Sequence, residues 1–202
     1  MKRKIRIPDL GGARAYILHR PHATVQALER QLRAIGLTVV HCWPELPAEA
    51  LSGDFVFFDA DQGYDEQFPW KTGESPMPMI ALIGTEAPGR IEWSLEAGAH
   101  AQILKPVGDG GVYSALLIAQ LAFEARAQLS GEIADLRRRL DERQTVVRAV
   151  TLLAARGKSE AEAYDQLRQM AMAWRVTFED AARRIVANHD EQRKSDDRRD
   201  LG

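Results

Sequence analysis

The sequence predicts two folded parts: an α/β domain with a doubly wound, five-stranded parallel sheet, and an all-α module of three helices that follows a long coiled-coil helix. In the first half of the chain, short apolar runs alternate with amphipathic helical patterns, as in parallel-sheet proteins. In the second half, apolar residues recur every three or four positions, and helix-capping residues interrupt the pattern. The 202 residues are enough for one full domain and a smaller second one.

Five short apolar runs are predicted to form the strands of the sheet. The third run contains four consecutive apolar residues, as expected for a strand that is buried on both faces. Helices are predicted at Thr24–Ile35 and Arg90–Ala97, each closed by a glycine. Residues 61–77 are rich in Gly, Pro and charged residues and are predicted to form an irregular loop. The predicted strands are Ala15–His19, Leu37–Trp43, Asp54–Asp59, Met79–Ile83 and Ala101–Leu104.

Three short pieces of this domain resemble a known family. Asp59 ends the third predicted strand, Ala97-Gly98-Ala99 precedes the fifth, and Lys105-Pro106 follows it. With these pieces, residues 13–125 resemble the receiver domains of response regulators, in which an Asp at this strand end accepts a phosphoryl group. The resemblance implies a receiver-like, flavodoxin-like fold, and it makes Asp59 with Lys105 the candidate phosphoacceptor position.

Two features of the receiver site are replaced in this sequence. Receivers hold Mg²⁺ with an acidic pair after the first strand, because the metal neutralises the incoming phosphoryl group. Here His19-Arg20-Pro21 occupies that place, and Ile83-Gly84 replaces the hydroxyl residue that ends the fourth strand, with Thr85 displaced by two. Asp59 is therefore either a phosphoacceptor or a polar strand-end residue paired with Lys105. We favour the second interpretation and predict a pseudo-receiver.

One long helix is predicted to connect the two parts, because from Val112 to Arg156 only Gly131 is a strong helix breaker. Apolar residues recur along it with the spacing of a coiled-coil seam, which predicts a parallel dimer. The alternative is a single helix that packs back on its own domain; we favour the dimer. The predicted seam consists of Ile118, Ala122, Ala125, Leu129, Ile133, Leu136, Leu140 and Val147.

The end of the chain carries the signals of three short helical segments. Gly157 ends the first, Ser159 with Glu162 forms a capping box for the second, and Thr177 with Asp180 repeats the cap before the third. One run of residues resembles the ANTAR family, which binds RNA and prevents transcription termination, although Val150 stands where that family usually has a lysine. The run is Arg143, Ala149, Leu152-Leu153, Gly157, Ser159, Glu162-Ala163-Tyr164, Leu167-Arg168, Ala171-Met172, Arg175, Phe178, Asp180, Ala182 and Ile185-Val186.

Cations and aromatic side chains of this module are the candidate RNA-binding residues. RNA loops are bound by stacking on aromatic or Arg planes and by cations on phosphates. Arg168 and Arg175 are seven residues apart and are predicted to share one face of the second helix. Tyr164 and Trp174 have an alternative role as core residues, which we favour for both. The candidates are Arg148, Arg156, Lys158, Tyr164, Arg168, Trp174 and Arg175.

Composition limits the other classes of function. The formal net charge is −2, so an RNA surface must be a local patch. The single cysteine, Cys42, suits a reducing compartment, and no apolar run reaches the roughly 18 residues of a membrane span, so we expect a soluble cytoplasmic protein. Because the sequence lacks a Walker loop, a metal-ligand cluster and a nucleophile constellation, we expect no enzyme, cofactor or metal site.

The order of these features resembles the bacterial amidase-operon antitermination regulators, a resemblance that Cys42-Trp43-Pro44 strengthens. It implies a homodimer that binds leader-mRNA hairpins and is silenced by a ligand-sensing partner protein. The alternatives are a phosphorylation-dependent response regulator that uses Asp59, and a DNA-binding or protein-interaction module. The predicted divisions are a basic arm (1–12, expected to be disordered), the pseudo-receiver (13–111), a coiled-coil linker (112–142), the ANTAR domain (143–188) and a charged, disordered tail (189–202).

Overall fold

The computed structural model describes residues 8–155 and 157–199, with side chains up to residue 192. The chain divides into two units, residues 1–128 and 129–202, and each has its own buried core. Helix α3, Val112–Ala154, crosses the boundary between them. Most of the predicted basic arm lies outside the described residues. At its described end Leu10 is buried in the core of the first unit, so the expectation of disorder is wrong at that residue.

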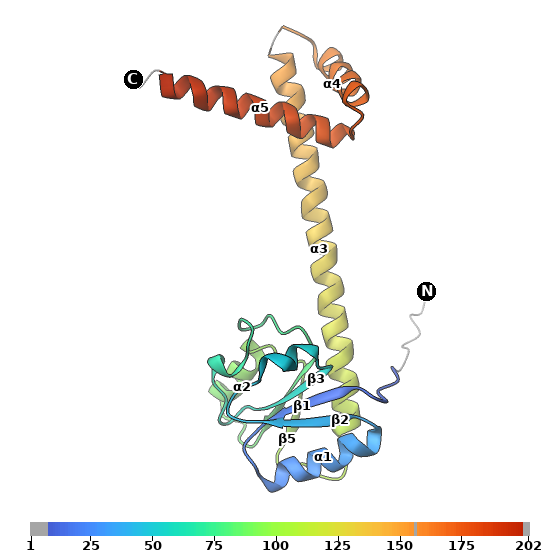
Figure 1. Cartoon of the computed structure of the whole chain (residues 1–202), viewed down its shortest axis with the longest axis vertical. Coiled ribbons are helices and arrows are strands. Elements are labelled where there is room, and N and C mark those ends of the chain that lie inside the picture. The colour runs from blue at the N-terminus through green and yellow to red at the C-terminus, as the bar shows by residue number, and fades with distance from the viewer. Residues whose placement is uncertain (1–7, 156, 200–202) are drawn as a thin grey trace. The chain divides into compact units, whose positions relative to one another are not determined.

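The first unit is built on a five-stranded parallel sheet in the order β2-β1-β3-β4-β5 (Figure 1). The predicted fold class is confirmed, and each predicted strand lies within one residue of its observed bounds. In this strand order the carboxyl ends of β1 and β3 lie side by side at the point where ligands bind in flavodoxin-like folds. The strands are β1 Arg14–Leu18, β2 Thr38–Cys42, β3 Phe55–Asp59, β4 Met79–Ile83 and β5 Ala101–Leu104.

Both faces of the sheet are covered, which explains the continuous apolar run of β3. On one face, α1, Ala23–Ile35, and the first turns of α3 pack against the strands. On the other face lie α2, Pro88–Glu96, the 3₁₀ segment Ala48–Ser52, and the loop that contains the 3₁₀ turn Asp65–Gln67. Every residue of β3 is therefore buried.

The first turns of α3 belong to the core of the α/β domain. Val112, Leu116 and Ala119 are fully buried against the sheet. The interpretation of residues 112–142 as a linker is therefore wrong for its beginning, because these side chains complete the face that α1 covers only in part.

The loop between β3 and β4 is irregular, as predicted, and aromatic packing holds it on the sheet. The Phe58 ring contacts Phe68 and Trp93 edge-to-face, with centroids 5.5 and 5.8 Å apart. Trp93 also donates from Nε1 to Asp65 at 2.8 Å. The Trp93 ring lies so close to Gly63 that a Cβ there would approach the ring to 2.1 Å. Glycine is thus required at this position by close packing.

The second unit consists of the end of α3 with α4, Glu160–Trp174, and α5, Phe178–Arg199 (Figure 1). Its core is made largely of alanine, which allows the helices to approach closely. Ser159 accepts from the Glu162 backbone N–H while the Glu162 carboxylate accepts from the Ser159 N–H, which confirms the predicted capping box. The buried residues are Ala149, Val150, Leu153, Ala163, Leu167, Ala171, Ala181 and Ala182.

The end of the chain differs from the prediction. Helix α5 continues to Arg199, so the expected disorder of the tail is wrong for residues 189–199; residues 200–202 lie outside the described part. Val150, which stands where the ANTAR family usually has a lysine, is buried in the core of this unit. Across the described ranges, no helix combines the length and apolarity needed to cross a membrane.

We predict that Gly63→Ala destabilises the first unit by about 1–3 kcal/mol, because the added methyl group must displace the Trp93 ring or the backbone. Urea denaturation followed by circular dichroism measures the loss. Gly89→Ala is the matched control, since Gly89 lies in α2 with no atom within 4 Å of the new Cβ. It should leave stability unchanged or raise it by up to about 1 kcal/mol. Equal midpoints for the two variants would contradict the assigned role of Gly63.

Candidate functional site

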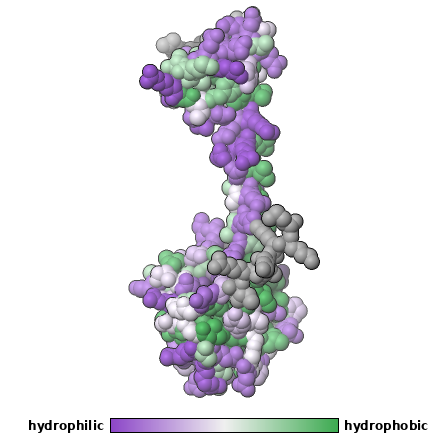
Figure 2. All heavy atoms as spheres, turned by 90° about the vertical axis from the view of Figure 1, so that its right-hand side faces the viewer, coloured by the Kyte–Doolittle hydropathy of each residue, from purple (hydrophilic) through white to green (hydrophobic). Residues whose placement is uncertain are grey.

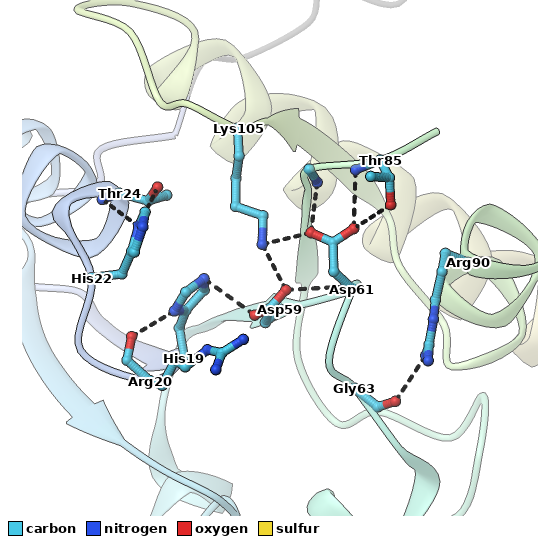
Figure 3. A network of polar contacts seen from close by, with 11 residues as sticks. His19, Arg20, His22, Thr24, Asp59, Asp61, Gly63, Thr85, Arg90 and Lys105 are labelled. Carbon is cyan, nitrogen blue, oxygen red and sulfur yellow. Dashed lines mark hydrogen bonds and ion pairs between the residues drawn. The ribbon is translucent and has the colours of Figure 1, made fainter. Parts of the chain in front are cut away.

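Asp59 lies at the carboxyl end of β3 and is almost completely buried, with 2% of its surface exposed. Lys105, which follows β5, donates from Nζ to Asp59 Oδ1 at 2.7 Å, so the predicted Asp59–Lys105 pair is present (Figure 3). The same ammonium group lies 2.6 Å from Asp61 Oδ2. One cation therefore bridges the two carboxylates at this edge of the sheet.

His19 occupies the place after β1 where receivers carry their acidic pair. Its Nδ1 lies 2.6 Å from the Arg20 carbonyl oxygen and therefore carries a proton. Its Nε2 lies 3.3 Å from Asp59 Oδ2, in a geometry that does not form a hydrogen bond. The imidazole is 95% buried, at 5% exposure, so it fills the space beside Asp59. The side chain that replaces the acidic pair is thus packed against the acceptor position.

Asp61 fixes the loop that follows β4. Its carboxylate accepts from the Gly84 N–H at 2.7 Å and from both the N–H and the hydroxyl of Thr85 at 3.0 Å. Burial raises the pKa of Asp61, but hydrogen bonds from Lys105, Thr85 and Gly84 outweigh it and lower the pKa to about 2. Asp61 therefore stays ionised at neutral pH as a structural anchor.

The same anchor excludes a hydroxyl residue at the end of β4. A Cβ at Gly84 would lie 2.6 Å from Asp61 Oδ2 and 3.1 Å from Lys105 Cε. Thr85, two positions beyond Ile83, uses its hydroxyl on Asp61. Among the described residues, no group of three His, Cys, Asp or Glu side chains is arranged to hold a metal ion. Both carboxylates of this edge thus find hydrogen-bond and ion-pair partners within the fold itself.

Residues 13–120 match the family described as AmiR, N-terminal, and residues 134–186 match the ANTAR domain. The chain belongs to the AmiR family of ANTAR-domain antitermination regulators. ANTAR domains bind RNA and this family is not enzymatic, which agrees with the sequence-based expectation.

The chain is similar to two curated regulators and, over part of its length, to a solved structure. The aliphatic amidase regulator of Pseudomonas aeruginosa is 28% identical over 176 residues, which cover 85% of this chain and 90% of that protein. The transcriptional regulatory protein PdtaR of Mycobacterium tuberculosis is 30% identical over 110 residues, 54% of each chain. A response regulator of known structure from Thermotoga maritima shares 21% identity with a TM-score of 0.41, over 51% of this chain and 92% of its own.

In the ANTAR unit, the two candidate aromatic side chains lie at the surface. Tyr164 is 42% exposed and Trp174 is 37% exposed, so the favoured interpretation of both as core residues is wrong. The Arg168 guanidinium lies 5.8 Å from the Tyr164 ring centroid, and Arg184 of α5 lies 5.7 Å from that of Trp174. We call these the two Arg–aromatic pairs. Arg184 is not among the candidates above, and no spacing rule connects it to Trp174 on another helix.

Two of the remaining candidate cations already have partners within the unit, and a third lies beyond the end of α4. Arg148 pairs with Asp190 at 2.7 Å, and Lys158 donates to Gln166 at 2.7 Å. Arg175 is not in α4: it caps the helix in the left-handed conformation, with φ 55°. The prediction that Arg168 and Arg175 share a helix face is therefore wrong, since the helix ends between them. Arg156 lies outside the described residues.

The predicted coiled-coil seam is exposed over most of its length. Leu129, Ile133, Leu136, Leu140 and Val147 are between 48% and 65% exposed. Figure 2 shows apolar (green) side chains gathered on the bare part of α3. Towards the start of the helix, Ile118 and Ala125 are exposed as well, whereas Ala122 is half-buried.

We predict that Asp61 gives the protein an acid-sensitive increment of stability. Its pKa is lowered on folding, so this stability is complete above about pH 4 and is lost as the pH falls towards 2; its size is about 2 kcal/mol. Urea denaturation of Asp61→Asn at pH 7 and at pH 3 should show a large loss relative to wild type at pH 7 and a smaller difference at pH 3. The exposed Asp109→Asn is the control and should behave as wild type. A pH-independent loss would contradict the role of the Asp61 charge.

Proposed function

We propose that the protein is a dimeric transcription antiterminator that binds hairpins of a leader mRNA and thereby prevents formation of a terminator. We further propose that a ligand-sensing partner protein controls it through the pseudo-receiver domain, in the bacterial cytoplasm. The observation that carries the proposal is the pair of exposed Arg–aromatic contacts on a matched ANTAR domain.

The Arg–aromatic pairs have the chemistry needed for an RNA loop. A splayed base stacks on an aromatic ring or a guanidinium plane, while the Arg charge attracts phosphate. Tyr164 is held in place by Phe178, whose ring centroid is 4.9 Å away, so little side-chain freedom would be lost on binding. Arg168 and Arg184 are therefore better placed for RNA than Arg148, whose charge is already neutralised by Asp190.

The exposed seam supports the dimer. A helix that leaves Leu129, Ile133, Leu136 and Leu140 in water has an unpartnered apolar stripe with coiled-coil spacing. Burial of each large side chain against a second copy would contribute about 1.5–3 kcal/mol. Two copies joined in this way would carry two ANTAR units, as binding of two hairpins requires.

The state of Asp59 supports control by protein contact over control by phosphorylation. The carboxylate is 2% exposed, bonded to Lys105 and packed against His19, which occupies the place of the acidic pair that holds the metal in receivers. The alternative, a response regulator activated by phosphoryl transfer to Asp59, would require this whole arrangement to open. We therefore assign the regulatory input of this domain to a partner protein.

We predict that Leu136→Asp with Leu140→Asp abolishes dimerisation, because two buried carboxylates would face their symmetry mates in the seam. Molar mass from light scattering at micromolar concentration should fall from twice the chain mass to the chain mass of 22.6 kDa. Ala134→Asp, at an exposed position outside the seam, is the control and should remain dimeric. A monomeric wild type, or a dimeric double variant, would disprove the coiled-coil interface.

We predict that Arg168→Ala with Arg184→Ala weakens RNA binding and lowers the slope of log affinity against log salt by about two, one for each lost phosphate contact. Gel-shift titrations with a leader RNA that carries tandem hairpins, at several salt concentrations, measure both quantities. Arg183→Ala is the matched control, because its guanidinium is already paired with Asp180 at 2.7 Å. If the double variant keeps the wild-type affinity and slope, the Arg–aromatic pairs do not form the RNA surface.

A further inference from the structure

The edge of the sheet beside Asp59 borders an open hollow of about 620 Å³, and Figure 3 shows several of the side chains that line it. Three permanent cations line it, Arg20, Arg90 and Lys105, against two carboxylates, Asp59 and Asp61. Magnesium sites need a surplus of carboxylate and carbonyl oxygen around the ion. The charge balance of this hollow has the opposite sign, which favours an anionic ligand.

The two carboxylates are also satisfied within the fold. Lys105 bridges them at 2.7 and 2.6 Å, and Asp61 accepts three further hydrogen bonds from Gly84 and Thr85. By contrast, none of the ion pairs and side-chain hydrogen bonds in the described part of the chain involves the Arg20 guanidinium, which is exposed at the hollow. The charge of Arg20 is therefore uncompensated.

The imidazole of His22 adds a hydrogen-bond donor to the same hollow, beside the ring of His19. The rings of His19 and His22 lie 6.1 Å apart, one after β1 and the other at the N-cap of α1. His22 Nδ1 accepts from the Thr24 N–H at 3.2 Å, so the neutral ring carries its proton on Nε2 and can donate it. His19 Nε2 is buried, lines the hollow and has no hydrogen-bond partner among the described residues. The positive end of the 13-residue helix α1 lies here as well.

We propose that this hollow binds inorganic phosphate or the phosphate group of a small monoester, without a metal ion and without phosphoryl transfer. Arg20 would pair with two phosphate oxygens through its planar fork, and the imidazole of His22 would donate to a third. The hollow is larger than phosphate alone and lies within the range of small-molecule sites, so it has room for the organic part of a monoester. The degenerate acceptor position thus becomes a reversible ligand site, independent of the proposed RNA binding.

The test uses the full-length protein without RNA, in buffer that contains EDTA, and inorganic phosphate as the probe. Thermal unfolding is followed while sodium phosphate is titrated against sodium chloride of equal ionic strength. Phosphate should raise the melting temperature with a saturable dependence, and Arg20→Gln should weaken the apparent affinity by at least about 10-fold. Arg30→Gln, an exposed Arg of α1 that does not line the hollow, is the matched control and should behave as wild type.

Three outcomes would overturn the proposal: chloride stabilises as much as phosphate, Arg20→Gln binds phosphate as wild type does, or magnesium chloride, in a separate titration without EDTA and without phosphate, gives its own saturable stabilisation. Melting curves without phosphate show whether Arg20→Gln remains folded; an unchanged baseline is expected for an exposed side chain. Glucose 1-phosphate as a second probe distinguishes the sources. Tighter binding than phosphate assigns the site to a monoester, and equal or weaker binding assigns it to the free ion.

Discussion

The bridge that Lys105 makes between Asp59 and Asp61 determines the character of the first unit. It joins the ends of β3 and β5 to the loop after β4, and it does so with side chains that are 2%, 18% and 15% exposed for Asp59, Asp61 and Lys105. A buried carboxylate needs a partner, so removal of the ammonium group would leave two like charges close together. An arrangement that serves phosphoryl transfer in receivers is here a structural connection between three strand ends.

Three residues near this bridge differ from those of receivers, and each fits the space or the hydrogen bonds around Asp59 and Asp61. His19 fills the space beside Asp59, Gly84 leaves room for the Asp61 carboxylate, and Thr85 donates to it. Each change alone would damage a receiver site, and the hydrogen bonds from Gly84 and Thr85 satisfy the Asp61 carboxylate within the fold. The cations that remain, above all Arg20, then make the hollow attractive to anions.

In the second unit, the residues that form the core are different from the residues that we propose bind RNA. Its stability comes from a core of alanine, leucine and valine and from two helix caps, so the large aromatic side chains of Tyr164 and Trp174 are free to lie at the surface beneath guanidinium groups. A small core of this kind needs close helix approach. That explains why Val150 is buried where a longer cation would have to reach out to solvent.

The sequence by itself determined the strands, the helix caps, the long helix and the family, because these depend on local periodicity and on residues adjacent in the chain. The missing acidic pair at His19-Arg20 and the exposed seam pattern also required no coordinates. Only the tertiary structure decided which residues meet across elements: Asp61 with Thr85, and Arg184 with Trp174. It also placed Arg175 beyond the end of α4, where helical spacing no longer applies. Helical periodicity says which side chains share a face, but the packing of neighbouring helices decides whether that face is buried, and for Tyr164 and Trp174 it is not.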